Sequence, residues 1–139
     1  MEFSGGCLCG AVRFIVHGEP LYAGCCHCRR CQRVSGSAFW TWVGFEPHNL
    51  KWTQDEPKLY QSSSQVQRGF CAECGSAVSF HREDAIAVSI TSLDAPEAVT
   101  PKEHIFIEMK LPWLKLCDDI PNVEGFGAEY EYLRDPDIQ

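Results

Sequence analysis

The chain has no apolar run long enough to cross a membrane, and its first residues lead straight into a cysteine motif with no signal-peptide pattern. Positive charge is scarce: 12 Lys and Arg stand against 19 Asp and Glu, for a formal net charge of -7. So acidic a chain is poorly suited to neutralising the phosphates of a nucleic acid. We therefore expect a cytoplasmic protein that binds neither membranes nor nucleic acid.

A sustained helical period of 3.6 residues is also missing, and the apolar residues gather instead in short runs rich in aromatic and β-branched side chains. Strands are expected at 11–16, 38–45, 50–53, 58–61, 66–71, 77–81, 86–90 and 104–109. An extended segment over 21–28 leads into a helical turn at 29–34, and a second turn starts at 94–97. The pattern predicts one mainly β, antiparallel domain over 1–139, with an irregular tail from about 112.

Cysteine, by contrast, is abundant, with nine residues of which eight lie in three clusters. Spacings this short aim several sulfurs at one point, as a tetrahedral metal site requires. Disulfides fit less well, because the count is odd, pairs one residue apart close poorly, and the cytoplasm is reducing. The clusters predict zinc, and more than one ion. They are Cys7 with Cys9, then Cys25, Cys26, Cys28 and Cys31, then Cys71 with Cys74.

Side-chain alternation along an extended segment sorts the central cluster. Cys26 and Cys28 share one face, and a tight turn over 29–30 can return Cys31 to it. These three ligands leave a fourth position open, as in zinc sites that accept water or a substrate atom. The alternative is a second closed site whose fourth ligand is one of four side chains: Cys25, His27, His104 or Cys117.

The same rule pairs Cys7 with Cys9, while Cys71 and Cys74 form a knuckle in which Gly75 relieves crowding behind the second cysteine. The two pairs together complete a closed site of four thiolates, which is the structural type. Such a site would fasten the N-terminal segment to a hairpin about sixty residues downstream and stabilise the fold by closing a long loop.

Seven side chains near the central cluster can be explained either by function or by packing. The arginines could hold carboxylates of a peptide thiol or form a solvated turn. The serines could stabilise a developing oxyanion, and the tryptophans could line a pocket, although turn chemistry and core packing are the simpler explanations. These residues are Arg29, Arg30, Arg33, Ser35, Ser37, Trp40 and Trp42.

Taken in order, the motifs closely resemble the glutathione-dependent formaldehyde-activating family, which includes the centromere protein V group. The resemblance rests on Gly5 to Val12, Cys26 to Gln32, Ser35 to Phe39 and Phe70 to Gly75, and it extends to about Trp113. It implies a β-tent fold of small antiparallel sheets with two zinc sites. By matched position, the structural ion would be held by Cys7, Cys9, Cys71 and Cys74, and the catalytic ion by Cys26, Cys28 and Cys31.

The activity of that family is the formation of S-hydroxymethylglutathione from formaldehyde and glutathione, a carbon–sulfur lyase reaction in reverse. The resemblance therefore implies a zinc-dependent lyase acting on adducts of an aldehyde and a small thiol such as glutathione. A zinc ion held by three thiolates suits this chemistry, because it is a weak Lewis acid that can hold an incoming thiol as a nucleophilic thiolate. The alternatives are a thiol or aldehyde carrier and a non-catalytic zinc-binding module.

Overall fold

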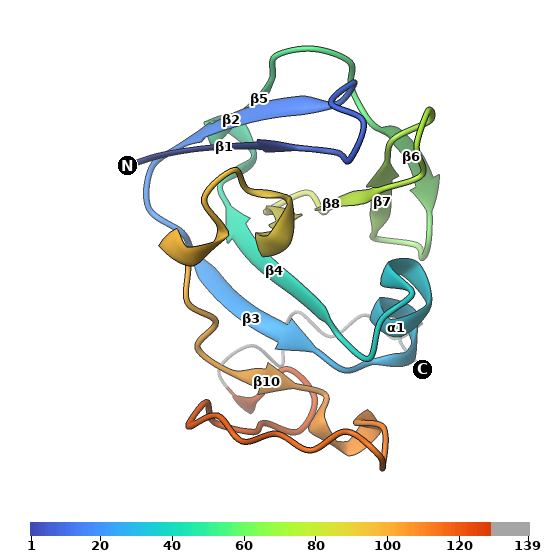
Figure 1. Ribbon diagram of the computed structural model, residues 1–139, viewed down its shortest axis with the longest axis vertical. Coiled ribbons are helices and arrows are strands. Elements are labelled where there is room, and N and C mark those ends of the chain that lie inside the picture. Colours follow the sequence, from blue (N-terminus) through green and yellow to red (C-terminus); the bar gives the residue numbers. More distant parts are fainter. Residues whose placement is uncertain (129–139) are drawn as a thin grey trace.

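A computed structural model describes residues 1–128, which form two β-sheets and a single seven-residue α-helix, α1 (Arg29–Ser35) (Figure 1). The smaller sheet has the order β1 (Glu2–Gly6), β2 (Arg13–His17), β5 (Leu50–Trp52). The larger sheet has seven strands in the order β10-β3-β4-β9-β8-β7-β6. Its strands are β3 (Tyr22–Cys26), β4 (Trp40–Phe45), β6 (Lys58–Gln61), β7 (Gln67–Phe70), β8 (Ala77–His81), β9 (Ile86–Ser89) and β10 (His104–Ile105).

This mainly β architecture of small sheets agrees with the expected fold class, and the helical turn expected at 29–34 is α1. Four 3-10 turns complete the regular elements of residues 1–128: η1 (Pro47–Asn49), η2 (Ile90–Ser92), η3 (Pro96–Ala98) and η4 (Ile107–Met109). In this part of the chain no helix has the length and apolar character needed to span a bilayer.

The strand expected at 104–109 is wrong beyond its first two residues. β10 ends at Ile105, because Phe106 adopts a left-handed conformation (φ 53°) and its N–H donates to the Gly125 carbonyl (2.8 Å). β10 also runs parallel to β3, whereas the other strand pairs of the larger sheet are antiparallel. The apolar run at 104–109 therefore does not continue as a strand, because the N–H groups of Phe106 and Ile107 donate to carbonyls of the tail rather than to a neighbouring strand.

Strand β1 was not expected, because its glycines look like a turn. It pairs with β2 along its whole length, and Phe3 faces the core opposite Val16. Gly5 is required there by close packing, since a Cβ would collide with the Ser92 carbonyl and the Phe14 ring. This glycine thus belongs to a crowded strand interior, where a backbone approaches closely.

The main hydrophobic core lies between the two sheets. β1 and β2 contribute Phe3, Phe14 and Val16, while the larger sheet contributes Val43, Phe45, Val78 and Val88. A second, smaller cluster surrounds the central cysteines and includes Trp40, Ala87, Ile105 and Phe106. The first cluster fixes the sheets relative to each other, and the second makes the environment of the central cysteines apolar.

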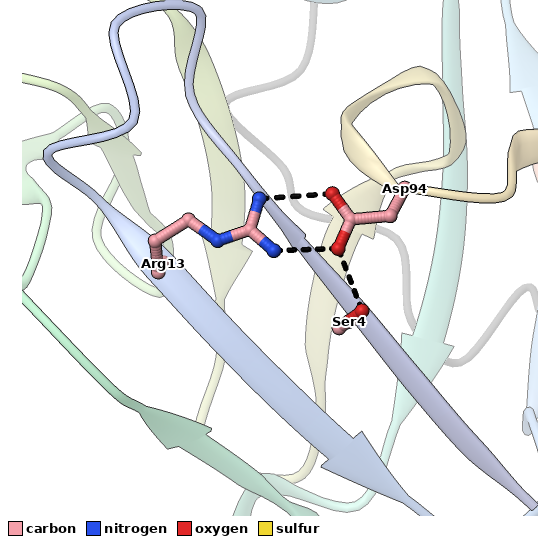
Figure 2. Close-up of polar contacts among 3 residues, drawn as sticks. All are labelled: Ser4, Arg13 and Asp94. Carbon is pink, nitrogen blue, oxygen red and sulfur yellow. Dashed lines mark hydrogen bonds and ion pairs between the residues drawn. The ribbon is translucent and has the colours of Figure 1, made fainter.

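A polar clasp joins β1 and β2 to the segment after η2 (Figure 2). The two terminal nitrogens of Arg13 bind the two carboxylate oxygens of Asp94 at 2.9 and 2.5 Å, and the Ser4 hydroxyl donates to Asp94 at 2.6 Å. The hydrogen bonds from Arg13 and then from Ser4 lower the pKa of Asp94 to about 2. This bidentate geometry is the strong form of an arginine–carboxylate pair.

Residues 111–127 form no named helix or strand, but they dock against β10, where Asn122 makes a β-bridge with His104. The N–H of His104 donates to the Pro121 carbonyl (2.8 Å), and the N–H of Val123 donates back to His104 (2.7 Å). The rings of Phe106 and Phe126 meet edge to face at 4.9 Å. The remainder of the expected irregular tail, 129–139, lies outside the described residues.

Candidate metal centres and the adjoining cavity

Four cysteine sulfurs converge where the turn after β1 meets the turn after β7. The sulfurs of Cys7, Cys9, Cys71 and Cys74 all lie within 4.8 Å of one another. Cys9 and Cys71 are 62 positions apart in the chain, yet their sulfurs are 3.7 Å apart. The structure therefore brings together the two pairs that the sequence predicts would share one ion.

The local backbone of the knuckle explains how Cys71 and Cys74 face the same point. Gly75 takes a left-handed conformation (φ 77°) and donates its N–H to the Cys71 carbonyl (2.8 Å). Ser76, which the sequence reasoning missed, links the two halves, since its hydroxyl accepts from the Leu8 N–H (3.0 Å) and lies 3.2 Å from the Cys74 sulfur. Hydrogen bonds from the Ser76 hydroxyl and N–H lower the pKa of Cys74 to about 5. These hydrogen bonds thus favour the thiolate form of Cys74.

The central cysteines form a second, deeply buried cluster. The sulfurs of Cys26, Cys28 and Cys31 lie within 4.8 Å of one another, and all three residues are buried. Cys26 ends β3, Cys28 is the N-cap of α1 with its sulfur accepting from the Cys31 N–H (3.4 Å), and the first helical turn returns Cys31 to them. We call these three residues the cysteine triple.

The thiols of the cysteine triple differ in their pKa values. Hydrogen bonds from the sulfurs of Cys26 and Cys31 lower the pKa of Cys28 to about 3, whereas burial raises the pKa of Cys26 well above its ordinary value. One thiolate is therefore stabilised by neighbouring thiols. A divalent cation would displace the remaining protons on binding, because metal ligation requires deprotonated sulfur.

Both clusters suit zinc by the chemistry of their donors, which are sulfur alone in each case. Four sulfurs can close a tetrahedron, and three leave one position for a further ligand. Within residues 1–128, no His, Asp or Glu joins either group. Assignment of Cys7, Cys9, Cys71, Cys74, Cys26, Cys28 and Cys31 as zinc ligands stays a prediction.

The side chains considered as a fourth ligand for the cysteine triple point elsewhere. His27 donates to or accepts from His104 through Nε2 and Nδ1 (2.8 Å), and His104 Nε2 contacts Asp118 (3.0 Å). Burial lowers the pKa of His27 to about 4. Cys25 is buried without joining the triple, and Cys117 is exposed.

A cavity of about 330 Å³ opens directly onto the cysteine triple. Both Trp40 and Trp42 line it, and Trp40 also packs in the smaller core cluster, so these side chains serve the pocket as well as the core. Ile105 and Phe106 add apolar wall from β10 and the residue after it. The cysteine triple therefore faces a largely apolar chamber of a size suited to a small molecule.

The arginines of α1 do not line this cavity. Arg29 donates to Gln32, and Arg30 donates to the Ser62 carbonyl. The serines after the triple serve the local turn, because the Ser35 hydroxyl donates to the Cys31 carbonyl (2.6 Å). The cavity takes its positive charge instead from two arginines, Arg68 and Arg82.

Sequence reasoning missed Arg68 and Arg82 because both are remote from the triple in the chain. Arg68 lies on β7, in the segment correctly expected to be a strand at 66–71. The sequence did contain a signal for Arg68, because side chains alternate between the two faces of a strand and this alternation places Arg68 on the same face as Val66 and Phe70. An arginine at an inward position of a strand indicates a buried charge.

The protein-family comparison matches residues 2–109 to the glutathione-dependent formaldehyde-activating enzyme family. The chain belongs to this family. A protein of Schizosaccharomyces pombe named as an uncharacterized lyase is 32% identical over 79 residues, which is 57% of this chain and 57% of that protein. The match thus spans little more than half of the length of this relative.

A crystal structure of a Rhodobacter sphaeroides protein shares the fold, with a TM-score of 0.57 and 21% identity over 86% of this chain and 99% of that one. The match to the formaldehyde-activating family ends at Met109. Phe126 lies beyond it and still lines the cavity. The tail of this family member therefore adds its own wall to the chamber beside the cysteine triple.

Proposed function

We propose that the protein is a zinc-dependent carbon–sulfur lyase that forms or cleaves adducts of a small thiol, such as glutathione, and an aldehyde, such as formaldehyde. The observation that carries the proposal is a triple of converging cysteine sulfurs that opens onto a cavity of about 330 Å³. Family membership and the lyase-named relative support the same class of reaction. The unpaired, clustered thiols suit a reducing cytoplasm.

Cys26, Cys28 and Cys31 would hold the catalytic ion, and when bound it would keep an incoming thiol in its thiolate form near neutral pH. In the forward direction the thiol gives up its proton, its sulfur bonds to the aldehyde carbon as the carbonyl π bond opens, and the carbonyl oxygen takes up a proton in turn. The reverse reaction breaks the same carbon–sulfur bond. Trp40, Trp42 and Phe106 contribute by excluding water around the reacting atoms, which strengthens the electrostatic interactions inside the cavity.

The other cluster has a structural role in this proposal. Cys7 and Cys9 belong to the turn after β1, whereas Cys71 and Cys74 belong to the knuckle after β7. An ion at this point would join segments that are distant in the chain and would stabilise the fold by its binding free energy. Ser76 supports it by hydrogen bonding to both sides of the junction.

The decisive measurement is the exchange rate between free formaldehyde and its glutathione adduct, followed by NMR exchange spectroscopy. Because the adduct also forms spontaneously, the proposal requires an exchange rate above the protein-free rate that is lost in Cys28→Ser. Cys117→Ser is the matched control, since Cys117 is exposed and outside both clusters. Saturable glutathione binding without faster exchange would identify a carrier instead.

A further inference from the structure

Arg68 is a buried charge beside the cysteine triple. It lies on β7, is only 7% exposed, and lines the same cavity as Cys28 and Cys31. Arginine is rarely buried to this extent unless an anion pairs with it, because removing a guanidinium from water costs free energy. The position therefore needs an explanation.

The protein supplies Arg68 with little compensation. Its guanidinium carbon lies 5.3 Å from the centroid of the Phe80 ring, a cation–π contact. Its Nε is buried without a hydrogen-bond partner, and no Asp or Glu of residues 1–128 forms an ion pair with it. The other arginine of the cavity differs, because Arg82 is paired with Asp84 at 3.2 Å. Arg68 thus faces the cavity as a desolvated cation with unused donor capacity.

We propose that Arg68 binds a carboxylate of the thiol substrate and so selects acidic thiols over uncharged ones. The inference rests on the proposed function and names the recognition element of the same site. A planar guanidinium can hold a carboxylate with two parallel hydrogen bonds, and this interaction is strongest where water is excluded. Because Arg68 and the cysteine triple share one cavity, a single ligand can present its sulfur to the triple and its carboxylate to Arg68.

The alternative role for Arg68 is to balance the negative charge of the cysteine sulfurs without touching the substrate. A probe without a free thiol separates the two roles. S-methylglutathione retains both carboxylates of glutathione but cannot offer a thiolate, and its dimethyl ester lacks the acidic groups. Binding of each is measured by isothermal titration calorimetry on the metal-loaded protein.

We expect the wild-type protein to bind S-methylglutathione at least about tenfold more tightly than the ester, as a charge-assisted hydrogen bond to a carboxylate implies. Arg68→Met should abolish this preference while binding of the ester stays unchanged. Arg68→Lys should keep part of it, because the charge remains but the two-pronged geometry is lost. Arg33→Gln, which removes an exposed arginine from α1, should keep all of it.

Folding of the variant is checked by thermal denaturation. Methionine matches the unbranched stem of arginine but not its guanidinium, so it gives up the cation–π contact with Phe80, and replacing a buried charge by an apolar side chain is often neutral for stability. Arg68→Met should therefore melt near the wild-type temperature. If it melts much earlier, Arg68→Lys, which retains the charge, provides the binding comparison.

Two results would overturn the inference: no preference for the acid in the wild-type protein, or an unchanged preference in Arg68→Met. If Arg68→Met keeps the preference but binds acid and ester equally more weakly, Arg68 serves charge balance alone. Failure of the proposed function is seen separately, as formaldehyde–glutathione exchange no faster than the protein-free rate. An acid-selective cavity in a protein without that acceleration would leave the carboxylate site in place.

Discussion

The imidazole rings of His27 and His104 share a hydrogen bond of 2.8 Å, although the residues are 77 positions apart in the chain. His27 stands between two cysteines of the triple, and His104 begins β10. Asp118 contacts the far side of His104 at 3.0 Å, from the segment that docks on β10. This chain of three polar side chains connects the backbone of the cysteine triple to the tail.

Replacing His104 by alanine should destabilise the protein. His27 Nε2 would lose its partner, and because His27 Nδ1 is already buried without one, the ring would have no hydrogen bond at either nitrogen. An unsatisfied buried polar group costs about 1–3 kcal/mol, which denaturant unfolding can resolve. His48→Ala, at an exposed position, should change the free energy of unfolding by less than about 0.5 kcal/mol. Equal effects of the two changes would contradict the structural role of the histidine pair.

Local spacing explains why the cysteine triple could be predicted from the sequence. Cys26 and Cys28 are two residues apart in an extended segment, so they share a face, and one helical turn brings Cys31 back to them. These relationships involve only six consecutive residues. They hold whatever the rest of the chain does.

The cavity beside the triple could not be predicted in the same way, because its walls come from separate strands. Arg68 is on β7, Phe80 is on β8 and Ile105 is on β10, which lies at the opposite edge of the sheet from β6 and β7, and the three side chains meet only around the cavity. The early end of β10 was missed for a related reason, since the backbone N–H groups of Phe106 and Ile107 donate to a tail that carries no periodic signal. Residues that are far apart in the chain but close in the fold leave no periodic signal in the local sequence.

The two cysteine clusters should respond differently to mutation. We expect about two zinc ions per chain in wild-type protein purified without added metal, and about one in Cys28→Ser. Cys74→Ser should unfold at a much lower temperature than Cys28→Ser, because a structural zinc site contributes on the order of 10 kcal/mol to folding. Elemental analysis and thermal melts measure the two effects. If Cys28→Ser melts as early as Cys74→Ser, the division into structural and catalytic ions is wrong.

The Arg13–Asp94 clasp should contribute stability that depends on acid pH. Its hydrogen bonds hold the pKa of Asp94 at about 2 in the folded state, below the ordinary value of 3.8, so the folded protein binds fewer protons than the unfolded chain between these values. The contribution is therefore complete above about pH 4 and is lost as the pH falls towards 2. Both side chains are partly exposed, 30% for Arg13 and 48% for Asp94, so the effect is at most about 1 kcal/mol.

The measurement compares wild type with Asp94→Asn, because loss of metal at low pH affects both proteins alike. Urea unfolding at pH 7 should show the variant to be the less stable of the two. Near pH 2 the two free energies of unfolding should converge. A difference that does not change with pH would mean that the carboxylate charge is not what stabilises the clasp.

Phe126 should limit the size of the aldehyde that the cavity accepts. It lies beyond the part of the chain matched to the family, packs edge to face on Phe106 at 4.9 Å, and lines the cavity. Gly125 and Gly127 on either side both have positive φ, 54° and 80°, so the backbone turns sharply around the ring and fixes its position. Ile105 of β10 forms only part of this wall of the cavity, so removing the Phe126 ring would widen the cavity there.

We therefore expect Phe126→Ala to raise adduct exchange with benzaldehyde relative to formaldehyde by several-fold, because the larger aldehyde gains room while the small one gains nothing. The ratio of the two rates is the useful quantity, since it is insensitive to a loss of about 1–3 kcal/mol of stability from the truncated, partly buried ring. Trp113→Ala is the matched control, because Trp113 is another tail aromatic but is 69% exposed and outside the cavity lining. If both variants leave the ratio at its wild-type value, the tail covers the cavity without setting its selectivity, and the size limit must come from the walls built by Trp40 and Trp42.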